Sequence, residues 1–380
     1  MGAKTLRLLH VVCLTGLAEA GAAQQARPVS DGRWELTAGG ARIERIDGRE
    51  AVAVESGVAY RRDVQLQDGT IELEVQVTRR RSFVYLMFRM ADDREFEEIY
   101  LRPHKSGLPD AVQYAPVYQG HSAWQLHHGP GATAAVAFEP GAWTRLKLVL
   151  QGRRAALFVG EAERPVLVAR LAREPRSGYL ALRGFLPPGA PGAGPVARFA
   201  NLSFRPGVVP FDFSSVPEEP LDTGPGVVRA WSVSKAFLPQ DSLAATPPDR
   251  DALGQLRRIE AHPSGLVELH RHVALPEGSR AAAAVARLKL RAAREELRAF
   301  DLGYSDRATV FLNGRPLFAG DASYSFDAPR RDGLIGFDQA RLWLPLVAGD
   351  NQLLVLVSDS FGGWGLMGRF PEGTGGLKIE

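Results

Sequence analysis

Apolar and polar residues alternate along much of the chain with the period of two that half-buried β-strands produce. The clearest run covers residues 69–77, where an apolar residue occupies every second position from Ile71 and glutamate or glutamine lies between. Residues 83–89 are apolar almost throughout, which is typical of a strand buried on both faces. Many short strands without a helical pattern between them predict a β-sandwich. Further strands are predicted at residues 34–36, 41–44, 51–55, 143–150, 155–159, 178–182 and 197–204.

The second half of the chain has the same character, with a tight-turn signal at Asn313 and Gly314. Residues 281–300 are ambiguous, because their alanine, leucine, arginine and glutamate content favours a helix whereas residues 288–292 alternate. We interpret this segment as two strands around a turn near Arg294, with a helix as the alternative. The predicted fold class is therefore all-β, with two β-sandwich (jelly-roll) domains. Strands are predicted at residues 227–234, 266–273, 297–304, 306–312, 316–318, 341–346 and 352–357.

Two segments differ from this pattern and indicate how the chain is divided. Lys4 and Arg7 precede an apolar stretch that ends in small residues, which predicts a secretory signal peptide at residues 1–23, with a frayed helix as the alternative. Prolines and acidic residues without periodicity at residues 207–226 indicate a semi-extended linker. The two sandwich domains are therefore expected at residues 24–206 and 227–380.

Composition narrows the class of protein further. Of the 380 residues, 45% are hydrophobic and 23% are charged, which is an ordinary globular composition and sufficient for two cores. The net charge is +3 and no basic block is interleaved with aromatic residues, which disfavours nucleic-acid binding. Cys13 is the only cysteine and lies in the predicted signal, so disulfides and cysteine-ligated metals are excluded from the mature chain. No later stretch approaches the ~18 apolar residues of a membrane span. We expect an exported bacterial protein, periplasmic or extracellular.

Four segments characterise the first predicted domain: DGTIELEVQV at residues 68–77, FVYLMFR at 83–89, GAWTRLKLVLQGRRAALFV at 141–159 and ARFANLSFRP at 197–206. Their order and character resemble a concanavalin A-like lectin/glucanase sandwich, the jelly-roll group that includes laminin-G-like and DUF1080-type domains. The resemblance implies a protein that faces glycans. It does not imply catalysis, because this fold serves lectins, binding modules and hydrolases alike.

The second predicted domain contains ATVFLNGRPLFAG at residues 308–320 and LWLPLVAGDNQLLVLVSDSFGGWGLMGRF at 342–370. These segments look like a galactose-binding-like β-sandwich, as found beside catalytic domains in many glycosidases. In that group V-x-L-N-G begins a hairpin and L-x-x-G-x-N introduces a late buried strand. The resemblance implies a structural support or a sugar binder, and we expect the glycine-framed Trp364 to belong to the core.

Polar and aromatic side chains are densest at residues 96–128, which we interpret as a short strand followed by a long loop. Loops on a rigid scaffold often carry sites, and aromatic faces with planar polar groups recognise sugars. The alternative is a loop packed by its own polar network, with Tyr114 and Trp124 in the core. The predicted ligand-binding residues are Tyr100, Arg102, Lys105, Asp110, Gln113, Tyr114, Tyr118, His121, Trp124 and His127.

If the protein is catalytic, Glu97 and His104 are the predicted acid–base groups, with Glu98 as the neighbour of Glu97. Glu72 and Glu74 share one strand face, as the acid and the nucleophile do in laminarinase-like hydrolases of the similar fold. Those enzymes carry Glu-x-Asp-x-x-Glu, and the third acid is missing here. We therefore interpret this glutamate pair as part of a solvated strand face.

No cofactor is predicted. His127 and His128 point to opposite faces of an extended chain, so only one of them could join His121 and Glu97 around a transition metal, and we do not predict such a site. Calcium is the open alternative, although no ligand loop is legible. The candidate calcium ligands are Asp92, Asp93, Asp301 and Asp306.

These patterns together predict an exported carbohydrate-binding protein whose ligand lies on the long loop of the first domain. One alternative is a glycoside-processing enzyme, either a glycoside hydrolase or a 3-keto-glycoside-type hydrolase, that uses the same loop. Another is an adhesion or assembly module with protein partners. Whether the protein is an enzyme stays open at this level.

Overall fold

The computed structural model describes residues 33–190, 193–216, 224–238, 246–248, 253–279, 281–326 and 331–380. The signal peptide predicted for residues 1–23 lies outside these ranges. Antiparallel strands dominate the described residues, which confirms the all-β prediction. Within the same ranges, no helix has the length and apolar character needed to cross a lipid bilayer.

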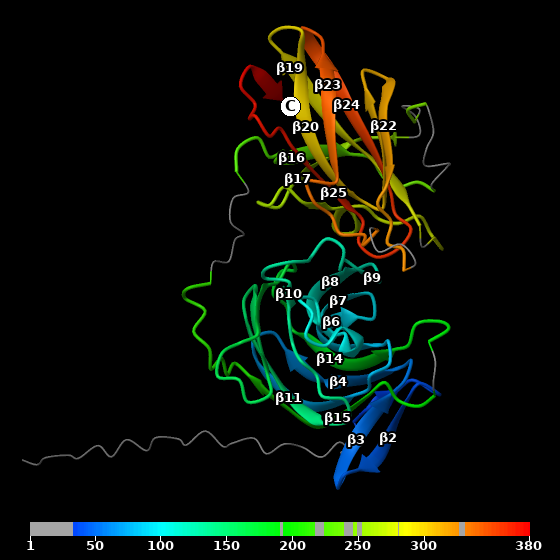
Figure 1. The fold of residues 1–380 in the computed structure, drawn as a ribbon, viewed down its shortest axis with the longest axis vertical. Coiled ribbons are helices and arrows are strands. Elements are labelled where there is room, and N and C mark those ends of the chain that lie inside the picture. Colours follow the sequence, from blue (N-terminus) through cyan, green and yellow to red (C-terminus); the bar gives the residue numbers. More distant parts are fainter. Residues whose placement is uncertain are drawn as a thin grey trace, which may run out of the picture.

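Strands between residues 35 and 206 form two sheets that face each other and make the first sandwich (Figure 1). Sheet I runs β1-β4-β14-β6-β7-β8-β10, with β9 paired to β8, and sheet II runs β13-β12-β11-β5-β15-β3-β2. Every second side chain of a strand points inward, so Leu86 of sheet I and Leu73 of sheet II share one apolar core. The strands of sheet I are β1 (Glu35–Leu36), β4 (Val58–Leu66), β6 (Phe83–Asp92), β7 (Glu95–Leu101), β8 (Val112–Tyr118), β9 (His121–Ser122), β10 (Thr133–Ala134) and β14 (Gly178–Phe185). Those of sheet II are β2 (Ala41–Ile46), β3 (Arg49–Val54), β5 (Gly69–Val77), β11 (Trp143–Gln151), β12 (Arg154–Val159), β13 (Leu167–Arg170) and β15 (Ala197–Pro206).

Strands after residue 229 form the second sandwich. Sheet III runs β17-β16-β19-β24-β21-β22, with β26 paired to β19, and sheet IV runs β18-β25-β20-β23. Phe300, Leu344, Val355 and Trp364 meet in its core, which confirms the core position predicted for Trp364. The strands are β16 (Ala230–Val233), β17 (Arg257–Glu260), β18 (Val267–Glu268), β19 (Ala283–Ala292), β20 (Glu296–Ser305), β21 (Arg307–Leu312), β22 (Arg315–Asp321), β23 (Ala340–Leu346), β24 (Gly349–Ser358), β25 (Gly365–Arg369) and β26 (Leu377–Ile379).

The ambiguous segment at residues 281–300 is indeed two strands, β19 and β20, with the turn at residues 293–295. Alternation therefore outweighed helix propensity, because β19 pairs with β16 and β24 along its two edges and buries its apolar face in the core of the second sandwich. The hairpin predicted at Asn313 and Gly314 is also present, between β21 and β22.

Two local predictions were wrong. Residues 270–273 do not continue a strand, because β18 ends at Glu268 and a four-residue helix, α2 (Leu269–His272), follows.

The long loop predicted after β7 is shorter than expected. After the short 3-10 helix η1 (Pro103–Lys105), residues 112–118 return to sheet I as β8 and pair with β7. Gln113, Tyr114 and Tyr118 are therefore strand residues whose faces are set by the pleat.

The predicted linker at residues 207–226 begins as a packed segment. Phe213 is buried with Val149, Ala156 and Phe158 on the outer side of sheet II, and its ring lies 4.7 Å from that of Phe211. Residues 217–223 lie outside the described ranges. Figure 1 shows β8 and β9 at the end of the first sandwich that faces the second.

Candidate functional site

The pleat of β7 sends its two adjacent glutamates to opposite sides of sheet I. Glu97 points inward, where it is 1% exposed and accepts hydrogen bonds from the Tyr114 hydroxyl at 3.1 Å and the Arg173 backbone N–H at 3.2 Å. Burial raises the pKa of Glu97, and the Arg89 guanidinium, 3.5 Å away, opposes this rise. Glu97, predicted as a catalytic group, is thus part of an interior network and out of reach of a surface ligand.

Gln113 holds the neighbouring loop in place. Its side-chain oxygen accepts hydrogen bonds from the Tyr100 hydroxyl at 2.7 Å and from Arg102 at 2.6 Å. Its amide nitrogen donates to the backbone oxygens of Trp124 at 2.7 Å and His127 at 2.5 Å. Every polar atom of this buried amide is therefore engaged within the protein. The alternative considered in the sequence analysis, a loop packed by its own polar network, therefore describes this part of the predicted site.

The remaining loop residues separate into exposed and buried groups. Lys105 and Asp110 form an ion pair near the surface, and Arg102 contacts the same carboxylate at 3.3 Å. Burial would raise the pKa of Asp110, but Lys105 and Arg102 hold it below its ordinary value. Tyr118 is buried beneath the Arg173 guanidinium, which lies 4.5 Å from its ring centre. The loop does not bring its predicted residues to one common surface.

Residues 119–128 contact the second sandwich. The His127 imidazole lies 2.7 Å from the Glu268 carboxylate, and His128 Nε2 lies 2.7 Å from the Ile335 carbonyl oxygen. Gln119 donates hydrogen bonds to the backbone oxygens of both His270, at 2.5 Å, and Val273, at 2.8 Å. Sequence reasoning missed this interface, because the partners lie about 140 residues or more along the chain and have no motif in common.

The outer side of sheet I carries a group of packed rings that we call the aromatic face, namely Phe83, Tyr85, Tyr100, His104 and Phe185. Cross-strand register places Tyr85 opposite Tyr100 and Phe185 opposite Phe83. Ring centres are 5.3 Å apart for Tyr85 and Tyr100, 6.0 Å for Phe83 and Phe185, and 5.4 Å for Phe83 and His104. Of the predicted site residues, Tyr100 and His104 belong to this face.

Guanidinium groups lie over the aromatic face. The Arg183 guanidinium is 5.1 Å from the ring centre of Tyr85 and 5.7 Å from that of Phe185. Arg102 is 5.2 Å from the ring centre of Tyr100. These distances are within the range of cation–π contacts. The face therefore combines apolar ring surface with planar hydrogen-bond donors.

A second set of rings continues this surface onto the other sandwich. Phe326 and Phe361 are 63% and 59% exposed, and Tyr324 is less exposed, at 38%. Trp124 packs against Tyr324 at 5.4 Å and against Phe361 at 6.3 Å. Arg81 joins the two sets, because its guanidinium lies 3.5 Å from the ring centre of Phe326 and electrostatically influences His104. We call the aromatic face, Arg81 and these four rings the aromatic belt.

One carboxyl group, that of Glu98, and one imidazole, that of His104, lie on this side of sheet I, and Glu98 is 1% exposed. Glu98 lies on the outer side of sheet I, where burial raises its pKa to about 7 although the Ser122 hydroxyl donates to it at 2.7 Å. Burial lowers the pKa of His104 to about 4, with Arg81 and Lys105 adding to the effect. Near neutral pH the imidazole is therefore uncharged, while the carboxyl group is poised to release or accept a proton.

A cavity of about 460 Å³ lies between the two sandwiches, apart from the belt. Four arginines and two glutamates contribute charge to its wall, and Glu268 is already engaged by His127. Burial lowers the pKa of His262 to about 4, so that imidazole is uncharged at neutral pH. The wall is therefore net positive and favours an anionic group. Its charged lining residues are Arg153, Arg257, Arg258, Arg271, Glu260 and Glu268.

Other candidate residues have partners within the protein. Glu72 contacts Arg145 and Arg205, and Glu74 bonds to Arg49 at 3.0 Å and Asn201 at 2.5 Å. These contacts tie neighbouring strands together on the outer side of sheet II, as a strand-face interpretation implies. The candidate calcium ligands are also hydrogen-bonded, and a calcium site stays a prediction. Their contacts are Asp92 with Arg94, Asp93 with Tyr179, Asp301 with Arg341 and Arg369, and Asp306 with Gln125, Ser360 and Phe361.

No family model matches the chain, and no curated protein matches it in sequence. The carbohydrate-binding module CBM66 from Bacillus subtilis is 15% identical over 45% of this chain and 94% of its own, with a TM-score of 0.35. A beta-glucanase from Bacillus licheniformis is 11% identical over 47% and 94%, with a TM-score of 0.36. A GH16 protein of the Bacteroides ovatus mixed-linkage glucan PUL is 9% identical over 48% and 98%, with a TM-score of 0.36. Likenesses this distant carry no functional argument, so function is argued from the residues themselves.

Proposed function

We propose that the protein binds carbohydrate along the aromatic belt. The observation that carries the proposal is the run of partly exposed rings, interleaved with guanidiniums, that passes from one sandwich to the other. Aromatic faces stack on the C–H surfaces of sugar rings, and guanidiniums donate to adjacent hydroxyl groups. Exposed rings in contact with one another also cost hydration free energy, which a ligand that covers them would recover.

The shape of the belt favours an oligosaccharide over a single sugar. Phe185 and Tyr85 lie on the first sandwich, whereas Tyr324 and Phe361 belong to the second. A chain of several sugar units would contact both sandwiches, and each stacked ring would add to the affinity. The signal predicted at residues 1–23 would bring the protein to polysaccharides outside the cytoplasm.

The test is a glycan array with the chain lacking residues 1–23, followed by calorimetry on any hit. Phe361→Ala and Tyr324→Ala should each weaken binding by about fivefold, since a stacked ring contributes roughly 1 kcal/mol. Trp343→Ala is the matched control, because Trp343 is an exposed aromatic residue on β23 outside the belt. The array should include uronate-containing glycans, given the basic cavity. Absence of any sugar ligand would refute the function, and binding that survives both ring substitutions would refute the site.

A second candidate function is glycoside processing, and the pKa of Glu98 is the observation that favours it. A carboxyl group that titrates near pH 7 can donate a proton to a leaving group and later take one back. Glu98 lies on the outer side of sheet I, as His104 does, whereas Glu97 is interior. Glu98 is nevertheless 1% exposed, as Glu97 is, so a substrate would reach it only if the covering side chains moved aside. Product analysis with β-glucans and 3-keto-glycosides tests this candidate. Turnover that persists in Glu98→Gln would exclude Glu98 as the proton donor.

A further inference from the structure

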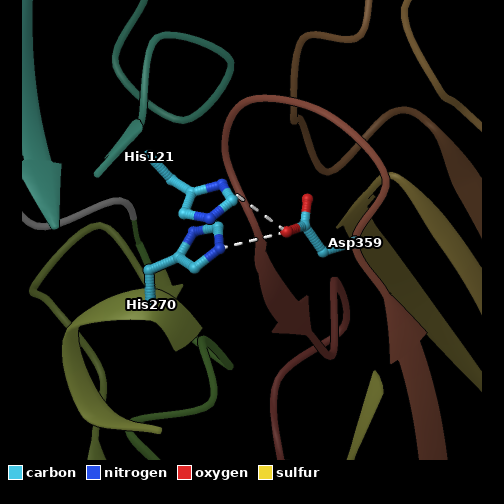
Figure 2. A group of neighbouring side chains, drawn as sticks. All are labelled: His121, His270 and Asp359. Carbon is cyan, nitrogen blue, oxygen red and sulfur yellow. Dashed lines mark hydrogen bonds and ion pairs between the residues drawn. The ribbon is translucent and has the colours of Figure 1, made fainter. Parts of the chain in front are cut away.

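Two histidines from opposite sandwiches converge on one aspartate at the interface. His121 belongs to β9 of the first sandwich, His270 lies in α2, and Asp359 follows β24 of the second. His270 Nε2 is 3.1 Å from Asp359 Oδ2, and His121 Nδ1 is 3.9 Å from the same oxygen. Figure 2 shows both imidazole rings directed at this carboxylate from one side. The three ligand-type atoms lie within 4.8 Å of one another.

The Asp359 carboxylate pairs with histidines and not with an arginine or lysine in the described part of the chain. The Asp359 side chain is 0% exposed, and within the described ranges its ion-pair partners are these two imidazoles. Its second oxygen, Oδ1, is buried without a hydrogen-bond partner, and so is Nδ1 of His270. A buried carboxylate is costly unless a positive charge or several donors satisfy it. The site is therefore short of positive charge.

The two imidazole rings lie side by side next to this carboxylate. The rings of His121 and His270 are stacked, with centres 4.3 Å apart and an angle of 18° between their planes. Each ring directs a nitrogen at the same Asp359 oxygen. A single cation bound by both imidazoles and the carboxylate would supply the missing positive charge.

We propose that His121, His270 and Asp359 bind one divalent first-row transition-metal ion between the two sandwiches. Neutral imidazole nitrogens and a carboxylate are the donors that Zn²⁺ and its neighbours in that row accept. Metal–ligand distances of roughly 2.1 Å require donor atoms within about 4.2 Å of one another. The two distances to Asp359 already meet this limit. Because the two rings are stacked, they would have to turn relative to each other for a nitrogen of each to bind one ion.

The ion would act as a clamp between the sandwiches. Gln119, beside β9, already donates to the His270 backbone oxygen, so the metal would reinforce an existing contact. Asp359 is two residues from Phe361, whose backbone N–H donates to Asp306 at 2.8 Å. The same ion would therefore fix the turn that presents Phe361 in the belt. The metal site does not depend on carbohydrate binding, so each proposal can fail without the other.

The test uses the tag-free chain lacking residues 1–23, stripped with a chelator and titrated with Co²⁺ as a spectroscopic probe. We expect one Co²⁺ per chain with visible d–d absorption, competition by Zn²⁺, and a rise in melting temperature with Zn²⁺. His121→Ala and Asp359→Asn should weaken Co²⁺ binding by at least about tenfold. His128→Ala is the control, because His128 contacts the same interface through Ile335 and lies outside the cluster.

Folding of the variants does not limit the test, because the wild-type titration is decisive by itself. A folded wild-type chain that binds no stoichiometric Co²⁺ or Zn²⁺ overturns the proposal. Stoichiometric binding that both His121→Ala and Asp359→Asn leave unchanged overturns the assignment of the ligands.

Discussion

Gln125 of the first sandwich donates a hydrogen bond to Asp306 of the second across 2.9 Å, and both side chains are completely buried. The side-chain oxygen of Gln125 also accepts the Gly363 backbone N–H at 2.5 Å. Asp306 in turn accepts the backbone N–H groups of Ser360 and Phe361, each at 2.8 Å. One amide of the first sandwich thus supports the turn that carries an exposed ring of the belt.

Replacing Gln125 with leucine should destabilise the protein by about 1–3 kcal/mol, because the Gly363 N–H loses its acceptor and Asp306 loses a donor. Chemical denaturation of the purified chain measures this change. Gln65→Leu is the control, since Gln65 is exposed on β4 and should change stability by less than about 0.5 kcal/mol. An equal effect of both substitutions would show that the interface contact does not stabilise the fold.

Gly362 should not tolerate a side chain. Its φ of +87° is the left-handed region, and an added Cβ would lie 2.7 Å from Trp124 Nε1 and closer still to Gln125. Gly362→Ala should therefore lower stability by more than the roughly 1–2 kcal/mol of left-handed strain alone. Gly349→Ala isolates that strain, because Gly349 has a φ of +92° and open space around it. Equal losses in the two variants would contradict the packing of the interface against Gly362.

Glu98→Gln should stabilise the protein at alkaline pH. Because the pKa of Glu98 in the folded protein is about 7, above the ordinary 4.5, the fold favours the protonated carboxyl group. Its stabilising contribution is complete below pH 4.5 and is lost as the pH rises through 7. The variant should therefore match wild type at pH 4 and exceed it by about 3 kcal/mol at pH 8.

Denaturation curves at several pH values measure this difference. Glu139→Gln, at an exposed position, is the control substitution. A difference between wild type and Glu98→Gln that stays constant from pH 4 to pH 8 would disprove the raised pKa.

Phe213→Ala should cost about 3 kcal/mol, as expected for an aromatic ring deleted from a packed site. Phe213 is buried against sheet II, and its backbone oxygen accepts a hydrogen bond from Arg154 at 3.1 Å. Thermal unfolding with and without the substitution measures the cost. Val208→Ala, at a position 43% exposed, serves as the control in the same segment. A loss below about 0.5 kcal/mol would mean that the linker is not anchored by this ring.

Much of the fold could be read from the sequence, because the alternation of β5, β11 and β19 follows directly from burying one face of a sheet. Strand alternation also implied that Glu97 and Glu98 point to opposite sides. It could not tell which side is the interior, since that depends on the sheet packed against β7 and on Tyr114 from β8.

The candidate site itself needed the tertiary structure. The sequence identified residues 96–128 as chemically rich and placed Tyr100, Arg102 and His104 among the candidates, and these lie on or beside the aromatic face. The other half of the belt, Tyr324 and Phe361, comes from a distant segment of the second sandwich. Likewise, His121 meets His270 and Asp359 only because the two sandwiches pack against each other. Local patterns determine which face of a strand is apolar, whereas contacts between distant segments arise from packing that no local pattern encodes.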